Sequence, residues 1–293
     1  MGESFEQFIE NSKETIEQKM KEYVQGDIPE NLYESMAYSL FAGGKRLRPI
    51  LLLAGFQSFG DNLDKVYRTA TALEMIHTYS LVHDDLPAMD DDDYRRGSLT
   101  NHKKFNEATA ILAGDGLLTN SFEIISDDPF LSDSEKVYII NTLAHAAGPA
   151  GMVAGQILDM EGETKQLTLE QLEEVHRLKT GKLISFAVDA GAYLAGATKE
   201  QREHLREYSH YLGLIFQVQD DILDVVGDPD KLGKPVGSDD ENEKSTYPKL
   251  LGLEGAKEQM KTYEEKALTA LKNSGAQGDY LEQLLVHFGS REY

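Results

Sequence analysis

The sequence predicts an all-α fold, and three observations support this prediction. Apolar residues recur at steps of three and four along most of the chain, which is the period of a helix with one buried face. Short alternating segments bounded by turns, which would indicate strands, are missing from the sequence. Glycine and proline pairs interrupt the apolar segments at intervals that suit short connections between helices.

The expected helices follow one another from the start of the chain. One apolar stripe consists of Phe5, Phe8, Ile9, Ile16 and Met20, and another includes Ala72, Leu73 and Ile76. Further helical segments are predicted at 120–125, 137–143, 169–178 and 205–226. The breakers that separate helices are Gly43-Gly44, Asp128-Pro129, Gly148-Pro149 and Ala195-Gly196.

The longest irregular segment is 227–248, which contains three prolines and mixed charge. Such a segment is either a connector or a functional lid. No short repeat and no interdomain linker is evident, so residues 1–293 are predicted to form a single domain.

The amino-acid composition argues against several classes of function. With 293 residues, of which 40% are hydrophobic, the chain can bury a substantial core. A formal charge of −22 argues against nucleic acid or an anionic membrane surface as a partner. Without cysteine there are no disulfides and no thiolate ligands. No apolar run could span a bilayer and the acidic start lacks a signal-peptide pattern, so a cytoplasmic protein without a stable membrane anchor is expected.

The second of two aspartate clusters lies within a helical segment. Asp220, Asp221 and Asp224 follow Gln217 in a mostly apolar stretch. At about 100° per residue, Asp220 and Asp224 lie one turn apart on the same stripe. Carboxylates crowded in this way repel one another unless a cation lies between them, and hard oxygen ligands suit Mg²⁺.

The first cluster contains Asp84, Asp85 and Asp90. Asp84 and Asp90 are six residues apart, which is about 240° of rotation on an ideal helix. They could share a metal only if the helix is distorted or ends between them. Pro87 lies between them and predicts that distortion, because proline removes a backbone donor and clashes with the preceding turn.

Together these motifs resemble those of the trans-polyprenyl diphosphate synthases. The resemblance is carried by Gly43-Gly44-Lys45-Arg46-Leu47-Arg48-Pro49, by the first aspartate cluster with Arg95-Arg96-Gly97, and by the second cluster. It extends over roughly 41–248. The longer first aspartate motif is most similar to that of bacterial-type farnesyl diphosphate synthases, and also to that of plant-type geranylgeranyl synthases.

The resemblance implies an all-α, single-domain isoprenoid-synthase-like bundle around a central cavity, and a homodimer. It implies that Asp84, Asp90 and Asp220 bind more than one Mg²⁺ ion that bridges the allylic diphosphate, with Asp85, Asp221 and Asp224 as supporting acids. By the same match the allylic diphosphate is held by Arg95, Lys179, Lys234 and Lys244. The isopentenyl diphosphate site, which needs no metal, comprises Lys45, Arg48, His77 and Arg96.

The implied reaction ionises an allylic diphosphate, dimethylallyl or geranyl, and adds isopentenyl diphosphate to give farnesyl diphosphate. The family's groups that stabilise the allylic cation match the Thr180 hydroxyl, the Lys179 carbonyl and the Gln217 amide. At the end of the chain, Arg291 is the candidate for a basic residue that closes over the substrate. Asp115 and Asp159 are expected to be structural acids.

Product length is expected to depend on the helix that precedes Asp84. Tyr79 and Ser80 come five and four residues before it, or roughly 6–8 Å deeper at about 1.5 Å per residue. In the family, an aromatic residue at the position of Tyr79 limits chain growth. The alternative is a tyrosine that only packs in the core.

Four other functions share some of these sequence features. A geranylgeranyl diphosphate synthase is the nearest alternative. A terpene cyclase would not need the Lys45 and Arg48 site, and a non-catalytic partner subunit should have lost some of the six aspartates, all of which are present. A metal-dependent phosphohydrolase lacks a candidate base or nucleophile here.

Overall fold

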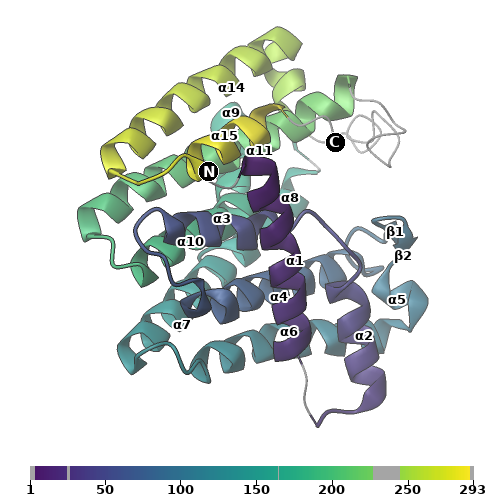
Figure 1. Ribbon diagram of the computed structural model, residues 1–293. Coiled ribbons are helices and arrows are strands. Elements are labelled where there is room, and N and C mark those ends of the chain that lie inside the picture. Colours follow the sequence, from purple (N-terminus) through teal and green to yellow (C-terminus); the bar gives the residue numbers. More distant parts are fainter. Residues whose placement is uncertain (1–3, 25–26, 164, 227–244, 291–293) are drawn as a thin grey trace. The chain divides into compact units, whose positions relative to one another are not determined.

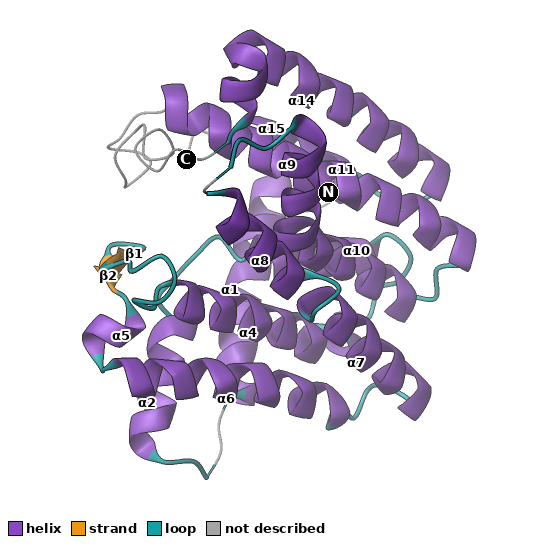
Figure 2. Cartoon of the chain, turned by 180° about the vertical axis from the view of Figure 1, so that it is seen from behind, coloured by secondary structure: helices purple, strands orange, loops and turns teal. Residues whose placement is uncertain are grey.

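A computed structural model describes residues 4–24, 27–163, 165–226 and 245–290. Within these ranges the regular secondary structure is helical apart from one short hairpin (Figure 1), which confirms the predicted all-α class. Figure 2 shows the secondary structure from behind; among the described residues, strands occur only in the hairpin.

The described elements in chain order are α1 (Phe5–Tyr23), α2 (Glu30–Leu40), α3 (Leu47–Gln57), η1 (Leu63–Lys65), α4 (Tyr67–Asp84), β1 (Tyr94–Arg95), β2 (Ser98–Leu99), α5 (Asn101–Lys104), α6 (Glu107–Ser126), α7 (Asp133–Ala147), α8 (Met152–Gly162), α9 (Leu169–His176), η2 (Arg177–Gly181), α10 (Lys182–Leu194), α11 (Lys199–Val226), α14 (Tyr247–Ser274) and α15 (Tyr280–Ser290). The four predicted breakers all lie in connections between these helices.

The chain forms two compact units. The first unit is Met1–Leu53 with Asn62–Asn141, and the second unit is Ala54–Asp61 with Thr142–Tyr293. Helix α3 begins in the first unit and ends in the second. The single domain expected for residues 1–293 therefore stays a prediction.

Helix α4 is the centre of the first unit. It is buried on almost every side, as expected for a helix whose residues carry little amphipathic contrast. It packs most extensively against α6, and α1 adds its stripe of Phe8, Ile16 and Met20, all nearly inaccessible to solvent. The aspartates that end α4 therefore extend from a rigid core element.

Helices α11 and α14 form the framework of the second unit, where they pack along one another (Figure 1). Large side chains of both helices are fully buried, including Tyr208 of α11 and Tyr247 at the start of α14. Helix α10 and the η2 turn pack on α11 as well. The second aspartate cluster occupies the last turns of α11, on this packed helix.

The hairpin of β1 and β2 departs from the sequence prediction. Its strands are only two residues long and pair Tyr94 with Leu99 and Arg95 with Ser98, so no alternating pattern could reveal them. The loop between them is Arg96-Gly97, with φ of 53° and 76°. Positive φ at both loop residues is what a two-residue type I′ hairpin requires.

None of the described helices is both long enough and apolar enough to cross a membrane.

Candidate active site

The first aspartate cluster lies where helix α4 ends. The helix stops at Asp84, and Asp85 is its C-cap, before Pro87 could disrupt it; proline disfavours helical backbone in the residue that precedes it. The chain then turns back, and the amide of Asp90 donates to the carbonyl of Asp84 over 2.8 Å. The break predicted between Asp84 and Asp90 is present, and it brings their backbones together.

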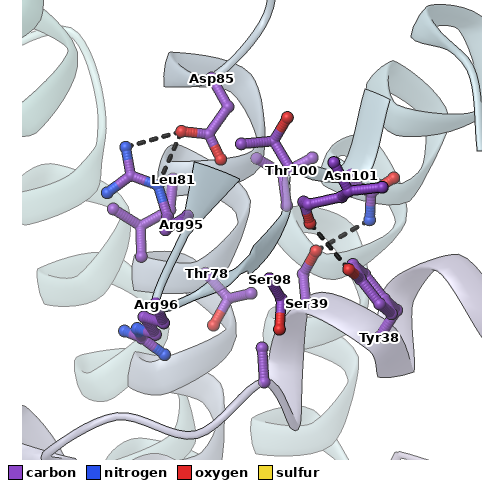
Figure 3. Close-up of a pocket in the computed structure, with 13 residues that line it drawn as sticks. Tyr38, Ser39, Thr78, Leu81, Asp85, Arg95, Arg96, Ser98, Thr100 and Asn101 are labelled. Carbon is purple, nitrogen blue, oxygen red and sulfur yellow. Dashed lines mark hydrogen bonds and ion pairs between the residues drawn. The ribbon is translucent and has the colours of Figure 1, made fainter. Parts of the chain in front are cut away.

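The hairpin directs Arg95 toward this cluster (Figure 3). Its Nε and Nη2 atoms both lie 2.6 Å from Oδ1 of Asp85, and Nη2 lies 3.5 Å from Asp92. Burial raises the pKa of the Asp85 carboxyl, although the adjacent Arg95 acts to lower it. Asp85 is therefore a partner of Arg95 in this structure.

Arg96 takes a different direction because it occupies the hairpin turn. Its Nη1 atom donates to the carbonyl of Gly43. A Cβ atom on Gly44, whose φ is +125°, would lie 2.6 Å from the same guanidinium nitrogen. The glycine pair thus allows Arg96 to lie directly on the connection between α2 and α3.

The positively charged side chains of the Lys45–Arg48 segment, which follows Gly43-Gly44, differ in their exposure to solvent. Lys45 is exposed, whereas the Arg46 side chain is fully buried. Arg46 donates to Glu74 over 2.7 Å, to Glu17 over 3.2 Å and to the carbonyl of Leu40 over 2.8 Å. Arg46 therefore joins α1, α2 and α4 within the first unit, a role that the basic motif did not reveal.

Arg48 and His77 are in contact, as expected of two residues predicted to share one site. Nη1 of Arg48 lies 3.3 Å from Nε2 of His77. Arginine can only donate, so Nε2 must be the unprotonated acceptor. Burial, followed by the charges of Arg48 and its neighbouring arginines, lowers the pKa of His77 well below 6.5, and the imidazole is neutral at pH 7.

The contact between Arg48 and His77 predicts that the stability of the protein depends on pH. Unfolding releases His77 to an ordinary pKa near 6.5, so the unfolded chain takes up a proton that the folded one does not. The free energy of unfolding should therefore fall as the pH is lowered from about 7.5 to about 5.5. In His77→Gln, denaturant titrations at both pH values should show a smaller decrease, the remainder coming from groups such as His176. An unchanged decrease would contradict this account.

Tyr79 and Ser80 lie one turn before the cluster on α4. Tyr79 is 7% exposed and its ring meets that of His83 edge-on, with centroids 5.8 Å apart. Burial and the nearby charge of Asp84 raise the pKa of Tyr79, so the phenol is neutral. Ser80 donates to the carbonyl of His77 over 2.9 Å. Both side chains are buried close to the first cluster.

In the second unit, the predicted helix at 169–178 changes form before it ends. Residues Arg177–Gly181 form a π-helical turn, η2, a feature that is frequent at functional sites. A Cβ atom at Gly155 of α8 would lie 2.2 Å from the backbone nitrogen of Lys179, so glycine there permits the close approach. The Nζ atom of Lys179 lies 2.5 Å from Oδ2 of Asp159. Asp159 is therefore an ion-pair partner of Lys179 in this structure, and its expected structural role stays a prediction.

The π turn places Thr180 against α11. The Thr180 hydroxyl donates to Oε1 of Gln217 over 2.6 Å, so two side chains predicted to act together are in direct contact.

Asp115, on α6 of the first unit, is predicted to be a structural acid, but its side chain is 58% exposed and lies 4.0 Å from His83. It therefore holds no part of the core.

The three carboxylates of the second cluster differ in their surroundings. Asp220 is half-buried, while Asp221 and Asp224 are 7% and 3% exposed. Oδ2 of Asp221 accepts the amide of Tyr247, at the first position of α14, over 2.8 Å. Asp221 therefore binds the start of a helix, where a carboxylate is favourable.

Both clusters suit Mg²⁺ in their chemistry. Each offers carboxylate oxygens, the donors that Mg²⁺ prefers. Among the described residues, no three acidic or histidine side chains gather closely enough to hold a metal by themselves. A Mg²⁺ ion is usually held by one or two carboxylates, with water and phosphate oxygens completing its coordination.

Three predicted residues lie outside the described ranges. Lys234 and Lys244 fall within 227–244 and Arg291 within 291–293. Their expected contacts with the substrate stay predictions.

Two groups of residues were not found from the sequence. A pocket in the first unit is lined by Tyr38, Ser39, Thr78 and Asn101 next to Arg95 and Arg96 (Figure 3). In the second unit, Tyr247 and His176 are packed beside the second cluster. Both groups are assembled from segments far apart in the chain, and neither has a local pattern.

The fold and the two aspartate clusters define a class of isoprenoid-forming protein. The chain matches the sequence profile of the Polyprenyl synthetase family over residues 29–284, and it belongs to that family. The match includes the basic motif, both clusters and the π turn.

Individual relatives are similar over nearly the whole chain. A farnesyl diphosphate synthase of Geobacillus stearothermophilus is 50% identical, with 99% of each chain covered. One of Bacillus subtilis is 49% identical, with 98% of each covered. The solved structure of a geranyltransferase from Legionella pneumophila has a TM-score of 0.86 and 35% identity, and the match covers 98% of this chain and 97% of that one.

Proposed function

We propose that this chain is a farnesyl diphosphate synthase, which joins isopentenyl diphosphate to dimethylallyl and then to geranyl diphosphate. The observation that carries this conclusion is the identity of about half of all residues, over nearly the full length, with proteins of that name. The six aspartates and the basic motif are all present, which disfavours a non-catalytic partner subunit.

In this proposal a different set of charged residues binds each of the two diphosphates. Asp84, Asp90 and Asp220 bind Mg²⁺, with Asp85, Asp221 and Asp224 in support. Arg95 and Lys179 bind the allylic diphosphate, together with Lys234 and Lys244. The contact of Arg48 with His77, and of Arg96 with the Gly43-Gly44 connection, supports a common site with Lys45 for isopentenyl diphosphate.

The chemistry follows from these groups. When bound, Mg²⁺ supplies positive charge that stabilises the diphosphate as it departs, and Arg95 and Lys179 add to this stabilisation. The allylic carbon–oxygen bond breaks and releases diphosphate, the double bond of isopentenyl diphosphate attacks the allylic carbon, and the released diphosphate takes up the proton that is lost. The oxygens of Thr180 and Gln217 lie together on the π turn and α11, where their lone pairs can face the allylic cation.

A homodimer is part of the proposal. Helix α6 exposes Ile111 and Leu112, which are 43% and 59% accessible in the single chain. These two side chains are candidates for the surface that a second copy covers.

The function is tested with purified protein, isopentenyl diphosphate, either dimethylallyl or geranyl diphosphate, and Mg²⁺, with products resolved by chain length. We expect a fifteen-carbon product and no turnover with a chelator. A twenty-carbon product would identify a geranylgeranyl diphosphate synthase instead. Release of diphosphate without chain extension would contradict prenyl transfer.

Tyr79 is expected to limit product length. Tyr79→Ala removes a large buried ring from α4 and leaves space near the first cluster, so products of twenty carbons or more should appear in the same assay. Tyr79→Phe, which keeps the ring, should still stop at fifteen carbons. If Tyr79→Ala also stops there, the tyrosine is only a core residue.

A further inference from the structure

The first residue of α14 connects three elements of the second unit. Tyr247 is fully buried, and its amide donates to Oδ2 of Asp221 over 2.8 Å. Thr246, the N-cap, accepts the amide of Lys249 through its hydroxyl over 3.4 Å. A side-chain cap and a charged acceptor together hold this helix start in one place.

The ring of Tyr247 contacts helix α9. It stacks on the ring of His176, with centroids 5.9 Å apart and planes 14° from parallel. Burial lowers the pKa of His176 to about 4, so a neutral imidazole forms this stack at pH 7. Tyr263 meets Tyr247 edge-on, 6.4 Å away, and donates its hydroxyl to Glu173 of α9, which adds a second link between α14 and α9.

These interactions form a closed ring of contacts that joins α9, the π turn η2, α11 and α14. His176 is the last residue of α9, directly before the π turn. Thr180 of that turn donates to Gln217 of α11. Asp221 lies one helical turn after Gln217 and accepts from Tyr247, whose ring returns to His176. Each element is therefore fixed to the next by a named contact.

We propose that His176 and Tyr247 are positioning residues, which set the π turn of Lys179 and Thr180 against the carboxylates of α11. Neither is assigned a contact with the substrate; Tyr247 contacts Asp221 and His176, and His176 directly precedes the π turn. Aromatic stacks and charge-assisted hydrogen bonds are rigid and directional. Displacement of a reacting group by about 1 Å can cost roughly a hundred-fold in rate. This inference rests on the proposed function.

The test compares Tyr247→Leu and His176→Ala with the parent protein under the conditions of the prenyl transfer assay. Each should lower kcat about ten- to hundred-fold. The KM for isopentenyl diphosphate should stay within about two-fold, because its proposed ligands belong to the first unit. Tyr247→Phe should retain kcat within about two-fold, since the ring face and the backbone amide remain. The double variant should lose much less than the product of the single losses.

Tyr208→Leu is the matched control. Tyr208 is also a fully buried tyrosine of the second unit, and it donates to the carbonyl of Leu281 over 2.6 Å, but it is outside the ring of contacts. It should lower the melting temperature and leave kcat near the parent value. Equal kcat losses in Tyr208→Leu and Tyr247→Leu, additive losses in the double variant, or normal kcat in Tyr247→Leu would each overturn the inference. An inactive parent would instead refute the proposed function.

Discussion

Asp220→Ala should reduce turnover about a thousand-fold, comparable to the loss of a group that stabilises charge in a transition state. Asp220 is the half-buried member of the second cluster. In the proposed function Asp220 is a chief Mg²⁺ ligand, whereas Asp221 also accepts the amide of Tyr247. Asp84→Ala, at the end of α4, should have an effect of the same order.

A readout other than activity separates metal binding from folding. For the parent, Mg²⁺ with a non-reactive allylic diphosphate analogue should raise the melting temperature, because a ligand of the folded state stabilises it. This rise should be lost in Asp220→Ala, while the melting temperature without ligand should stay close to that of the parent, because Asp220 is only half-buried and substitutions outside the core usually change stability little. Asp115→Asn, at an exposed position, is the control and should behave as the parent. Near-normal turnover in Asp220→Ala would refute its role as a ligand.

Arg46→Met should lower the free energy of unfolding by about 3–5 kcal/mol, the usual cost of removing one partner of a buried ion pair. The change leaves the carboxylate of Glu74, only 3% exposed, without its 2.7 Å partner. It also removes the donor to the carbonyl of Leu40. Denaturant titration of the two proteins measures the difference.

Two further variants sharpen this prediction. Arg46→Met combined with Glu74→Met should recover much of the lost stability, because apolar side chains of similar size can replace a buried pair. Lys45→Ala, next to it but exposed, should change stability by less than about 0.5 kcal/mol while raising the KM for isopentenyl diphosphate. If Lys45→Ala is as destabilising as Arg46→Met, the distinction between these neighbours fails.

Local patterns were sufficient to predict much of this protein. Apolar periodicity predicted the all-α class and segments of α1, α4, α6, α7, α9 and α11, because a helix with a buried face repeats its apolar residues every turn. Pro87 predicted the break after Asp84, because its effect on the backbone acts over neighbouring residues. The aspartate clusters and the basic motif indicated the family, since their spacing is a property of the chain itself.

Local patterns could not predict the hairpin or the π turn. Strands of two residues carry no alternation, and the π turn depends on how closely Gly155 lets Lys179 approach α8. That approach joins residues that are distant in the sequence. Thr180 meets Gln217 only through this packing.

Short-range patterns in the chain indicated the helical class, the family and the residues that carry charge. The direction of each charge depends on the packing of segments that are far apart in the chain. Arg46 and Arg48 are two residues apart, yet Arg46, with φ of 52°, is buried against Glu74, and Arg48 contacts His77. Asp221 likewise binds the amide of Tyr247 from a helix that starts 26 positions later. A side chain's direction depends on backbone torsion and on partners from other segments, and neither is encoded in its neighbours alone.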